Sequence, residues 1–425
     1  MKNMFLNKTI RRGFSLLLTA VMLASAAAGL GGCKAGSKLP EISLSVWSDE
    51  RNQELLEGMI AEFEEKYKDE ATFSITVSDE SELTCKETVL MNPEAAADVY
   101  IFADDQFEEL WRAGALLEIT ENTDAVIEAN GGAEGGAIRS AMRDGKLYAY
   151  PETAGNGYFL YYNKEYFSEE DVKSFDRILD VAAQNGKKVA MDFSSGWYIY
   201  SFFKGAGLEL ECNEDGVTNR CNWNATDTKY KGVDVAQAML DISMHDGFVS
   251  CVDDDFMIGV KNGSIIAGIN GAWNAADIQK AYGENYAAVK LPEYTLAGDS
   301  VQMCSFAGYK LVGVNAYSKN PHWAMMLAEW ITNEENQIKR FEAVGECPSN
   351  VNAAADEKVQ TSPAVAALTA QSKYGYTQSV ADQFWDPACV FGTTIAAKNT
   401  DGKDLQTLLD NLVEKVTAVS VKKAE

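Results

Sequence analysis

A repeated alternation of short apolar strands with amphipathic helices, beginning at Pro40, restricts this chain to a small set of folds. Apolar residues recur at every second position over residues 42–47, which predicts a strand, and at helical spacing over residues 55–63. Further strands are predicted over 73–77 and 98–102, with another helical stretch between them. Strands and helices in this order indicate a parallel sheet that is covered by helices.

The same pattern restarts after Tyr150, which predicts a second sheet and therefore a second lobe. Strands are predicted over 188–191 and 264–269, and a helix over 233–245. The length of the chain also favours two domains over one, because a single domain typically holds ~100–200 residues. Ligands of open parallel sheets bind beyond the carboxyl ends of the strands, so two facing lobes would share a cleft.

The N-terminus has the pattern of a secretory signal. Four basic residues precede an uncharged apolar run over residues 14–30, which is short and rich in alanine for a membrane-spanning helix. The run leads into Leu-Gly-Gly-Cys, ending at Cys33, which resembles the bacterial lipobox. We therefore expect residues 1–32 to be a lipoprotein signal peptide, Cys33 to carry the lipid, and residues 33–39 to form a tether. A transmembrane anchor is the alternative, and either would hold the protein at the outer face of the cell membrane.

Composition disfavours several classes of partner. Removal of the signal segment would take away four cations and change the net charge from −26 to −30, which argues against binding nucleic acid. Only His245 and His322 are present and no CxxC pair occurs, so we predict no metal site and no cofactor. Cys212 and Cys221 flank a turn-like stretch, and the sequence leaves a disulfide between them open.

Aromatic rings and carboxylates follow several of the predicted strands, at the point where the chain leaves the sheet. A pyranose presents an apolar face of C–H groups and a rim of hydroxyls, so its receptor needs flat rings and forked hydrogen-bonding groups. One tryptophan alone is more often part of a core, and one carboxylate alone is more often solvated. Their shared location instead indicates a sugar site. The residues concerned are Trp47, Asp49, Glu50, Phe102, Asp105, Trp197, Trp273 and Trp385.

Four motifs in one order give a specific resemblance. They are DVYIFADDQF at 98–107, GKLYAYP at 145–151, YNK at 162–164 and INGAW at 269–273. Together they resemble the maltose-binding-protein-like family 1 extracellular solute-binding proteins of ABC sugar importers, and the likeness runs from about Glu41 to the C-terminus.

This resemblance implies an α/β, two-lobed periplasmic-binding-protein fold of type II, each lobe a mixed, mostly parallel sheet flanked by helices. Lobe one would hold residues 40–153 and 309–362, and lobe two residues 156–306 and 366–425, with hinge strands at the crossings and the ligand in the cleft. It further implies a monomeric, non-enzymatic receptor that binds an oligosaccharide and delivers it to permease subunits. Maltose or maltodextrin is the first choice for this oligosaccharide. When the family's ligand contacts are carried over residue by residue, lobe one would present Phe102 and Asp105 to the ligand, with Asp49 and Glu50 nearby. Lobe two would present Asn156, Trp197, Trp273 and Trp385.

Departures from the family pattern leave the cargo open. Phe102 stands where the maltose-binding members have tryptophan, Gln106 where they have arginine, and Asn156 where they have glutamate. One alternative is a surface-anchored glycoside hydrolase, because such enzymes also combine tryptophans with paired carboxylates. The other is the same fold with a different cargo, such as a non-glucan oligosaccharide, an amino acid, a peptide, a polyamine or a metal. A charged cargo would favour a forked arginine in the cleft, and the candidate set contains none.

Overall fold

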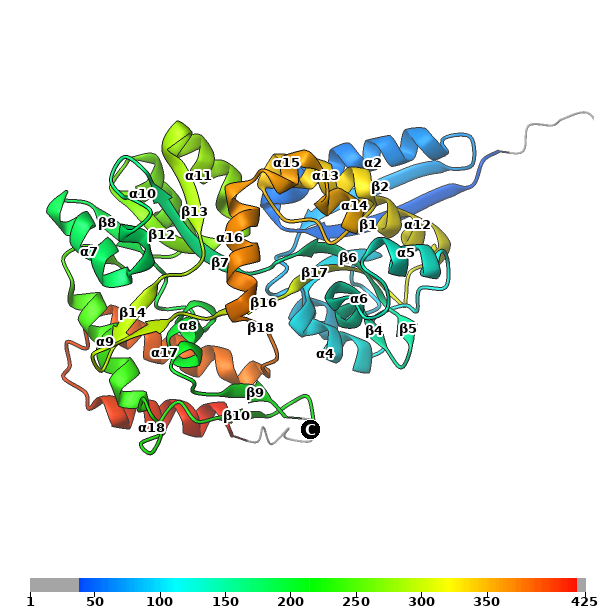
Figure 1. Ribbon diagram of the computed structural model, residues 1–425. Coiled ribbons are helices and arrows are strands. Elements are labelled where there is room, and N and C mark those ends of the chain that lie inside the picture. The colour runs from blue at the N-terminus through cyan, green and yellow to red at the C-terminus, as the bar shows by residue number, and fades with distance from the viewer. Residues whose placement is uncertain (1–37, 214, 419–425) are drawn as a thin grey trace, which may run out of the picture.

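Two lobes lie side by side in the computed structural model, each built around a five-stranded sheet (Figure 1). The structure describes residues 38–213 and 215–418. The expected signal peptide over residues 1–32, the lipidated Cys33 and most of the tether lie outside the described residues. Within the described ranges, no helix has both the length and the apolar character needed to cross a bilayer.

The sheet of lobe one has the strand order β2-β1-β3-β17-β6. The strands are β1 (Glu41–Ser48), β2 (Thr72–Asp79), β3 (Val99–Ala103), β6 (Ala149–Ala154) and β17 (Tyr309–Val314). The first three are parallel, as predicted, and β17 runs antiparallel between β3 and β6. Alternate residues of β1, Ile42, Leu44 and Val46, are buried in the core, which explains the period of two in the sequence.

Helices cover both faces of this sheet. The long helix α2 (Gln53–Tyr67) buries Leu56, Met59, Ile60 and Phe63, which recur at helical spacing. Asn333 caps helix α13 (Glu334–Val344) by accepting a hydrogen bond from the Asn336 backbone N–H at 2.9 Å. The remaining helices of lobe one are α3 (Cys85–Met91), α4 (Phe107–Arg112), α5 (Thr123–Ala129), α6 (Gly136–Ala141), α12 (Pro321–Ile331), α13 (Glu334–Val344), α14 (Val351–Ala354) and α15 (Glu357–Gln360).

Lobe two repeats this plan with the strand order β11-β8-β12-β7-β13. Its strands are β7 (Tyr158–Asn163), β8 (Lys188–Ala190), β11 (Phe248–Val249), β12 (Ile265–Gly271) and β13 (Tyr286–Val289). The predicted helix over 233–245 is α9 (Gly232–Met244). The other helices are α7 (Phe175–Gln184), α8 (Gly196–Gly205), α10 (Asp253–Lys261), α11 (Ala275–Tyr282), α16 (Pro363–Gln371), α17 (Trp385–Ala396) and α18 (Leu405–Val416).

The described chain passes between the lobes three times. It leaves β6 for β7, returns from β16 (Ser305–Ala307) to β17, and passes from α15 to α16, which stands upright between the lobes (Figure 1). The first two passages are joined where the Asn156 backbone N–H donates to the Gly308 carbonyl oxygen at 2.9 Å. A Cβ atom at Gly308 would lie 2.6 Å from the Asp104 Oδ1 atom, so a side chain at this passage would have to displace the Asp104 carboxylate.

The hairpin between Cys212 and Cys221 contains no disulfide. Strands β9 (Leu210–Cys212) and β10 (Asn219–Cys221) pair antiparallel, but their register sets Cys212 opposite Asn219 and Cys221 opposite Leu210. The two thiols are therefore not facing partners, and both are free.

Candidate ligand-binding cleft

A cavity of ≈ 430 Å³ lies between the lobes, within the ~300–1,000 Å³ range of small-molecule sites. Lobe one contributes charged and amide groups, notably Asp49, Arg51, Glu82, Lys86, Asp105, Gln106 and Lys310. Lobe two contributes three indole rings and further polar groups, notably Asn156, Asp192, Trp197, Tyr198, Asp253, Trp273, Gln378, Asp382 and Trp385.

Six of the nine sequence-predicted ligand residues line this cavity. They are Asp49, Asp105, Asn156, Trp197, Trp273 and Trp385. Thus, residues more than 300 positions apart in the sequence meet at one cavity, as the facing-lobe arrangement predicts.

The other three predicted residues, Trp47, Glu50 and Phe102, do not line this cavity, and the burial of Phe102 contradicts its expected place in the cleft. Phe102 is 0% exposed and packs in the core of lobe one, where its ring centroid lies 6.0 Å from that of Tyr100. Strand β3 is covered on both faces, so its aromatic side chains enter the core instead of the cleft. Trp47 is half-buried against the same core, and Glu50 is solvent-exposed outside the cavity.

The three tryptophans of lobe two that line the cavity stand at the starts of helical segments, which fixes their backbone. Trp197 is the second residue of α8 and Trp385 the first of α17, and Trp273 lies in the 3-10 turn η4 (Ala272–Asn274) that follows β12. All three rings are half-buried. The ring centroids of Trp197 and Trp273 are 5.5 Å apart at an interplanar angle of 34°.

Protein acceptors already bind two of the indole N–H groups. The Trp197 Nε1–H donates to Gln378 Oε1 at 2.8 Å, and the Trp273 Nε1–H donates to Asp253 Oδ2 at 2.7 Å. These bonds hold the ring planes in place, so these two tryptophans can offer a ligand their apolar faces.

Asp105 supplies an acceptor on the opposite wall. Its Oδ1 atom is buried and has no hydrogen-bond partner among the described residues. Burial raises the pKa of Asp105 to about 6, although a hydrogen bond from Gln378 and the charge of Lys86 act in the opposite direction. Burial and the nearby Asp105 also raise the pKa of Asp104, to about 8. The unpartnered Asp105 oxygen is therefore suited to accept a ligand hydroxyl.

Three cations line the cavity among the described residues, including an arginine that the sequence reasoning did not place there. Arg51 donates from Nε to Asp49 Oδ1 at 2.9 Å. Burial alone would raise the pKa of Asp49, but the hydrogen bond and charge of Arg51 outweigh it, so the pKa is lowered. The cleft therefore does contain an arginine, contrary to the sequence-based expectation that disfavoured a charged cargo, although Asp49 neutralises it.

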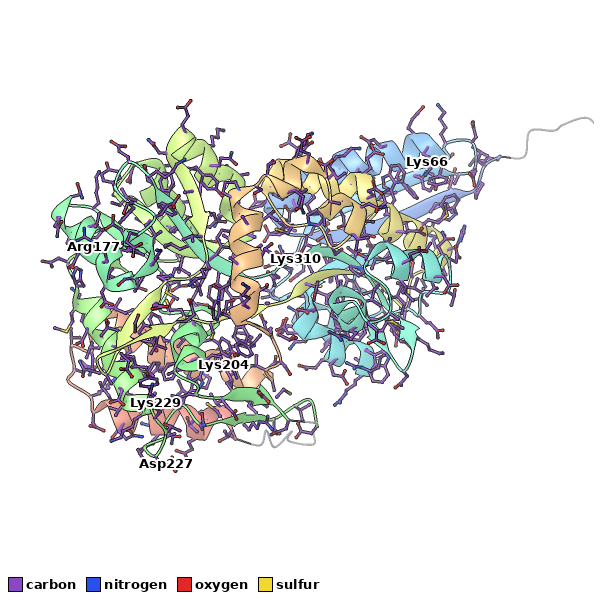
Figure 2. All side chains as sticks on the ribbon, in the orientation of Figure 1. Lys66, Arg177, Lys204, Asp227, Lys229 and Lys310 are labelled. Carbon is purple, nitrogen blue, oxygen red and sulfur yellow. The ribbon has the colours of Figure 1, made fainter. Side chains whose placement is uncertain are left out.

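The two cleft lysines are also neutralised by protein carboxylates. The Lys86 Nζ atom lies 2.6 Å from Asp382 Oδ1 and 3.0 Å from Glu109 Oε1, which joins lobe one to lobe two. The second lysine, Lys310, lies near the junction of the lobes (Figure 2). Its Nζ atom contacts Glu346 Oε1 at 2.6 Å and also bonds Glu82. Both lysines are therefore paired with carboxylates, and among the described residues of the cavity no unpaired positive charge is left for an anionic cargo.

The sequence carries only weak signals for Lys310 and Asp253, two cavity residues that were not predicted. Lys310 interrupts the otherwise apolar strand β17, and an isolated charge in a buried strand indicates a partner or a function. Asp253 begins a run of three aspartates at the first turn of α10, a pattern that equally suits a solvated helix N-terminus. The roles of both depend on partners that are distant in sequence.

Comparison with known proteins gives a consistent result. The family model described as bacterial extracellular solute-binding protein matches residues 58–367. The galactooligosaccharide-binding protein of Bacillus subtilis (strain 168) is 27% identical over 416 residues, covering 91% of this chain and 93% of that protein. The maltodextrin-binding protein MdxE of the same organism is 25% identical over 366 residues, covering 81% and 82%.

Solved structures agree on the architecture. The maltodextrin-binding protein MalE1 from L. casei BL23, solved without ligand, superposes with a TM-score of 0.72 at 25% identity, covering 89% of this chain and 100% of that one. The two lobes, the mixed sheets and the interlobe cavity are thus those of a periplasmic-binding-protein fold, and the family model spans most of the chain. This protein belongs to the family of bacterial extracellular solute-binding proteins.

Proposed function

We propose that this protein is the oligosaccharide-binding subunit of an ABC importer and that it encloses its cargo by closing the two lobes. The observation that carries the proposal is the pairing of three tryptophans on lobe two with the unpartnered Asp105 oxygen on lobe one, across one cavity. Flat rings match the C–H faces of pyranoses, and carboxylates match their hydroxyls.

Closure would follow from contacts that both lobes make with one ligand. A sugar that stacks on Trp273 and Trp385 while donating a hydroxyl to Asp105 binds the closed form more tightly than the open form. The passages at Asn156 and Gly308 would absorb the change in backbone angles. No bond in the cargo needs to break in this cycle.

The cargo is proposed as a neutral oligosaccharide of several pyranose units. Malto-oligosaccharides are the first choice from the sequence resemblance, and the names of the two Bacillus subtilis relatives support both malto- and galacto-oligosaccharides. The neutralised cations of the cleft argue against an anionic cargo.

The remaining parts of the proposal concern the location of the protein. Lipidation of Cys33 would hold a monomeric receptor at the outer face of the membrane, beside the permease subunits that receive the sugar. Mass spectrometry of the protein purified from membranes should find diacylglycerol on Cys33, and a Cys33→Ala variant should be released into the medium.

A thermal-shift screen would test the proposed cargo. Maltotetraose and a galacto-oligosaccharide would be compared with an amino acid and a polyamine. The cognate ligand at a hundredfold excess over Kd should stabilise the fold by about 2.7 kcal/mol. Calorimetry on Trp273→Ala and Trp385→Ala should then show affinity lower by about fivefold or more, because a lost stacking partner costs about 1 kcal/mol or more. Trp111→Ala removes a half-buried ring outside the cavity and serves as the matched control. No stabilisation by any sugar would refute the proposal.

Glycoside hydrolysis is the competing function, because several carboxylates line the cavity. Incubation with maltotetraose and with a galacto-oligosaccharide, followed by chromatography, distinguishes the two functions. We expect the sugars to be recovered intact, and any shorter product would favour the enzyme.

A further inference from the structure

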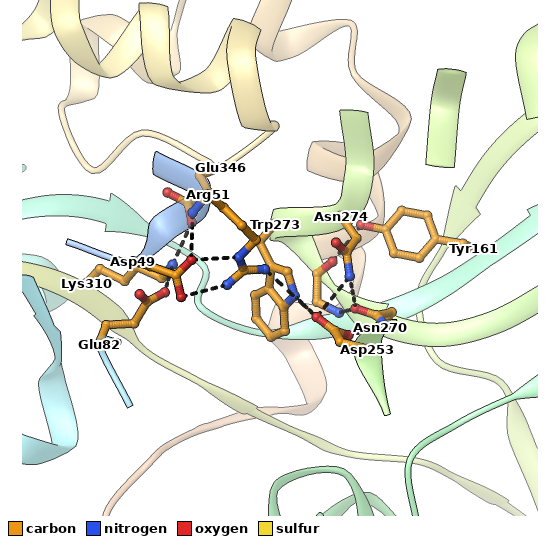
Figure 3. A network of polar contacts seen from close by, with 11 residues as sticks. Asp49, Arg51, Glu82, Tyr161, Asp253, Asn270, Trp273, Asn274, Lys310 and Glu346 are labelled. Atoms are coloured by element: carbon orange, nitrogen blue, oxygen red, sulfur yellow. Dashed lines mark hydrogen bonds and ion pairs between the residues drawn. The ribbon is translucent and has the colours of Figure 1, made fainter. Parts of the chain in front are cut away.

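Asp253, at the first turn of α10 in lobe two, is occupied by donors from its own lobe. Its Oδ1 atom accepts a hydrogen bond from Asn270 Nδ2 at 2.7 Å. Its Oδ2 atom accepts from Trp273 Nε1 at 2.7 Å and from Asn274 Nδ2 at 3.1 Å (Figure 3). With three donors on two oxygens, Asp253 has little capacity left for a ligand hydroxyl, although it lines the cavity.

The same bonds fix the Trp273 ring. The indole lies directly over Gly271, where a Cβ atom would approach ring carbons to 2.2 Å. Trp197 borders the ring on another side, with the two centroids 5.5 Å apart. Rotation of the ring away from this position would break its bond to Asp253, so Asp253 determines the plane that the indole presents to the cavity.

Arg51 reaches the same carboxylate from the opposite lobe. Its Nε atom and its Nη2 atom contact the two oxygens of Asp49 at 2.9 and 3.4 Å, which directs the guanidinium across the cleft. The remaining Nη1 atom lies 3.9 Å from Asp253 Oδ2, the oxygen that holds the Trp273 N–H. Figure 3 shows this series of contacts running from Asp49 through Arg51 and Asp253 to Trp273.

We propose that Asp253 is a positioning residue that couples lobe closure to the orientation of Trp273, with Arg51 as its partner on lobe one. When the lobes separate, Arg51 moves away with lobe one and Asp253 holds the indole alone. When they close, the guanidinium approaches the oxygen that holds the ring, so the closed state is favoured most when the ring is in place. The inference rests on the proposed function, in which Trp273 stacks on the cargo.

A double-mutant cycle tests this coupling by calorimetry with the sugar identified in the thermal-shift screen. Arg51→Gln should weaken binding by about two- to fivefold, because both side chains of the ion pair are more than one-third exposed and such pairs are weak. Asp253→Asn should weaken it by about tenfold or more, because it disturbs the ring as well. The double variant should match Asp253→Asn alone, because Arg51 keeps its bond to Asp49 within lobe one but has no carboxylate partner on lobe two left to lose.

Arg177→Gln is the matched control. Arg177 is 50% exposed and pairs with Asp171 in lobe two, with its Nε atom 2.7 Å from Asp171 Oδ1, outside the cavity. Its removal should leave the affinity unchanged. If the effects of Arg51→Gln and Asp253→Asn simply multiply in the double variant, or if Arg51→Gln has no effect, the coupling is refuted.

Tryptophan fluorescence of the ligand-free protein gives a second test that does not depend on the cargo. Asp253→Asn should shift the emission spectrum and increase quenching by acrylamide, and the same substitution in a Trp273→Phe background should change neither. Unaltered emission in Asp253→Asn would overturn the positioning role even if no sugar binds. Failure of every sugar to bind would instead count against the proposed function, while this fluorescence comparison would still decide the role of Asp253.

Discussion

Lowering the pH from 7 to 5 should weaken sugar binding by about tenfold if Asp105 accepts a ligand hydroxyl as its carboxylate. Burial raises the pKa of this group to about 6, against a hydrogen bond from Gln378. At that pKa the carboxylate is about nine-tenths ionised at pH 7 and about one-tenth ionised at pH 5. Because only the ionised form offers all its oxygen lone pairs, affinity should rise with pH and reach a plateau above about pH 7.

Calorimetry across this pH range measures the effect directly. A donated hydroxyl also favours the ionised form, so binding near pH 6 should release protons and the apparent enthalpy should depend on the buffer. Asp192 lines the same cavity and burial raises its pKa too, so the wild-type profile alone does not assign the group.

The Asp105→Asn variant makes that assignment. At pH 7 its affinity should resemble that of the wild-type protein at pH 5, and it should change little with pH. A flat wild-type profile between pH 5 and 7.5, or the same slope in the variant, would refute the role given to Asp105.

Three further predictions concern the walls of the cleft. Gly271→Ala places a methyl 2.2 Å from the ring of Trp273 at an ordinary backbone angle, φ −76°, so the ring must move; calorimetry should show weakened sugar affinity, and the melting temperature should fall as the bond to Asp253 is disturbed. Asp382→Asn removes the lobe-two partner of Lys86 and so one contact between the lobes. Solution scattering should then show a larger radius of gyration for the sugar-bound protein. Sugar binding should be weaker by about two- to fivefold, and the effect should be smaller at high salt. The folded-state pKa of Asp104 is raised to about 8. Its protonated form therefore stabilises the fold at low pH, and this contribution is lost as the pH rises toward 8. Asp104→Asn, which cannot ionise, should therefore raise the melting temperature more at pH 8.5 than at pH 6.

The architecture could be predicted from the sequence because local patterns determined it. The apolar alternation of β1 and the helical spacing of α2 each report burial on one face, and both appear in the structure as expected. The antiparallel insertion of β17 between β3 and β6 could not be derived in the same way. It depends on a pairing across more than 150 residues, which no local period records.

The site was predictable where a residue's role depends on its position after a strand or at the start of a helix. Trp273 and Asp105 meet that condition and both line the cavity. Phe102 does not, because it is still inside β3, where both faces of the sheet are covered. Arg51 and Asp253 were missed because their importance comes from facing each other across two lobes, and surface charges with such partners resemble solvated ones in sequence.

The two walls of the cleft differ in their chemistry. All three indoles at the cavity belong to lobe two, whereas all three cations that line it, among the residues the structure describes, belong to lobe one. Substitutions on one wall can therefore alter selectivity while the other wall is kept, provided that the contacts between the lobes from Arg51 to Asp253 and from Lys86 to Asp382 are retained. Receptors of this design can diversify by exchanging half of the groove at a time, and hybrids that join lobes from different relatives offer a practical route to new glycan preferences.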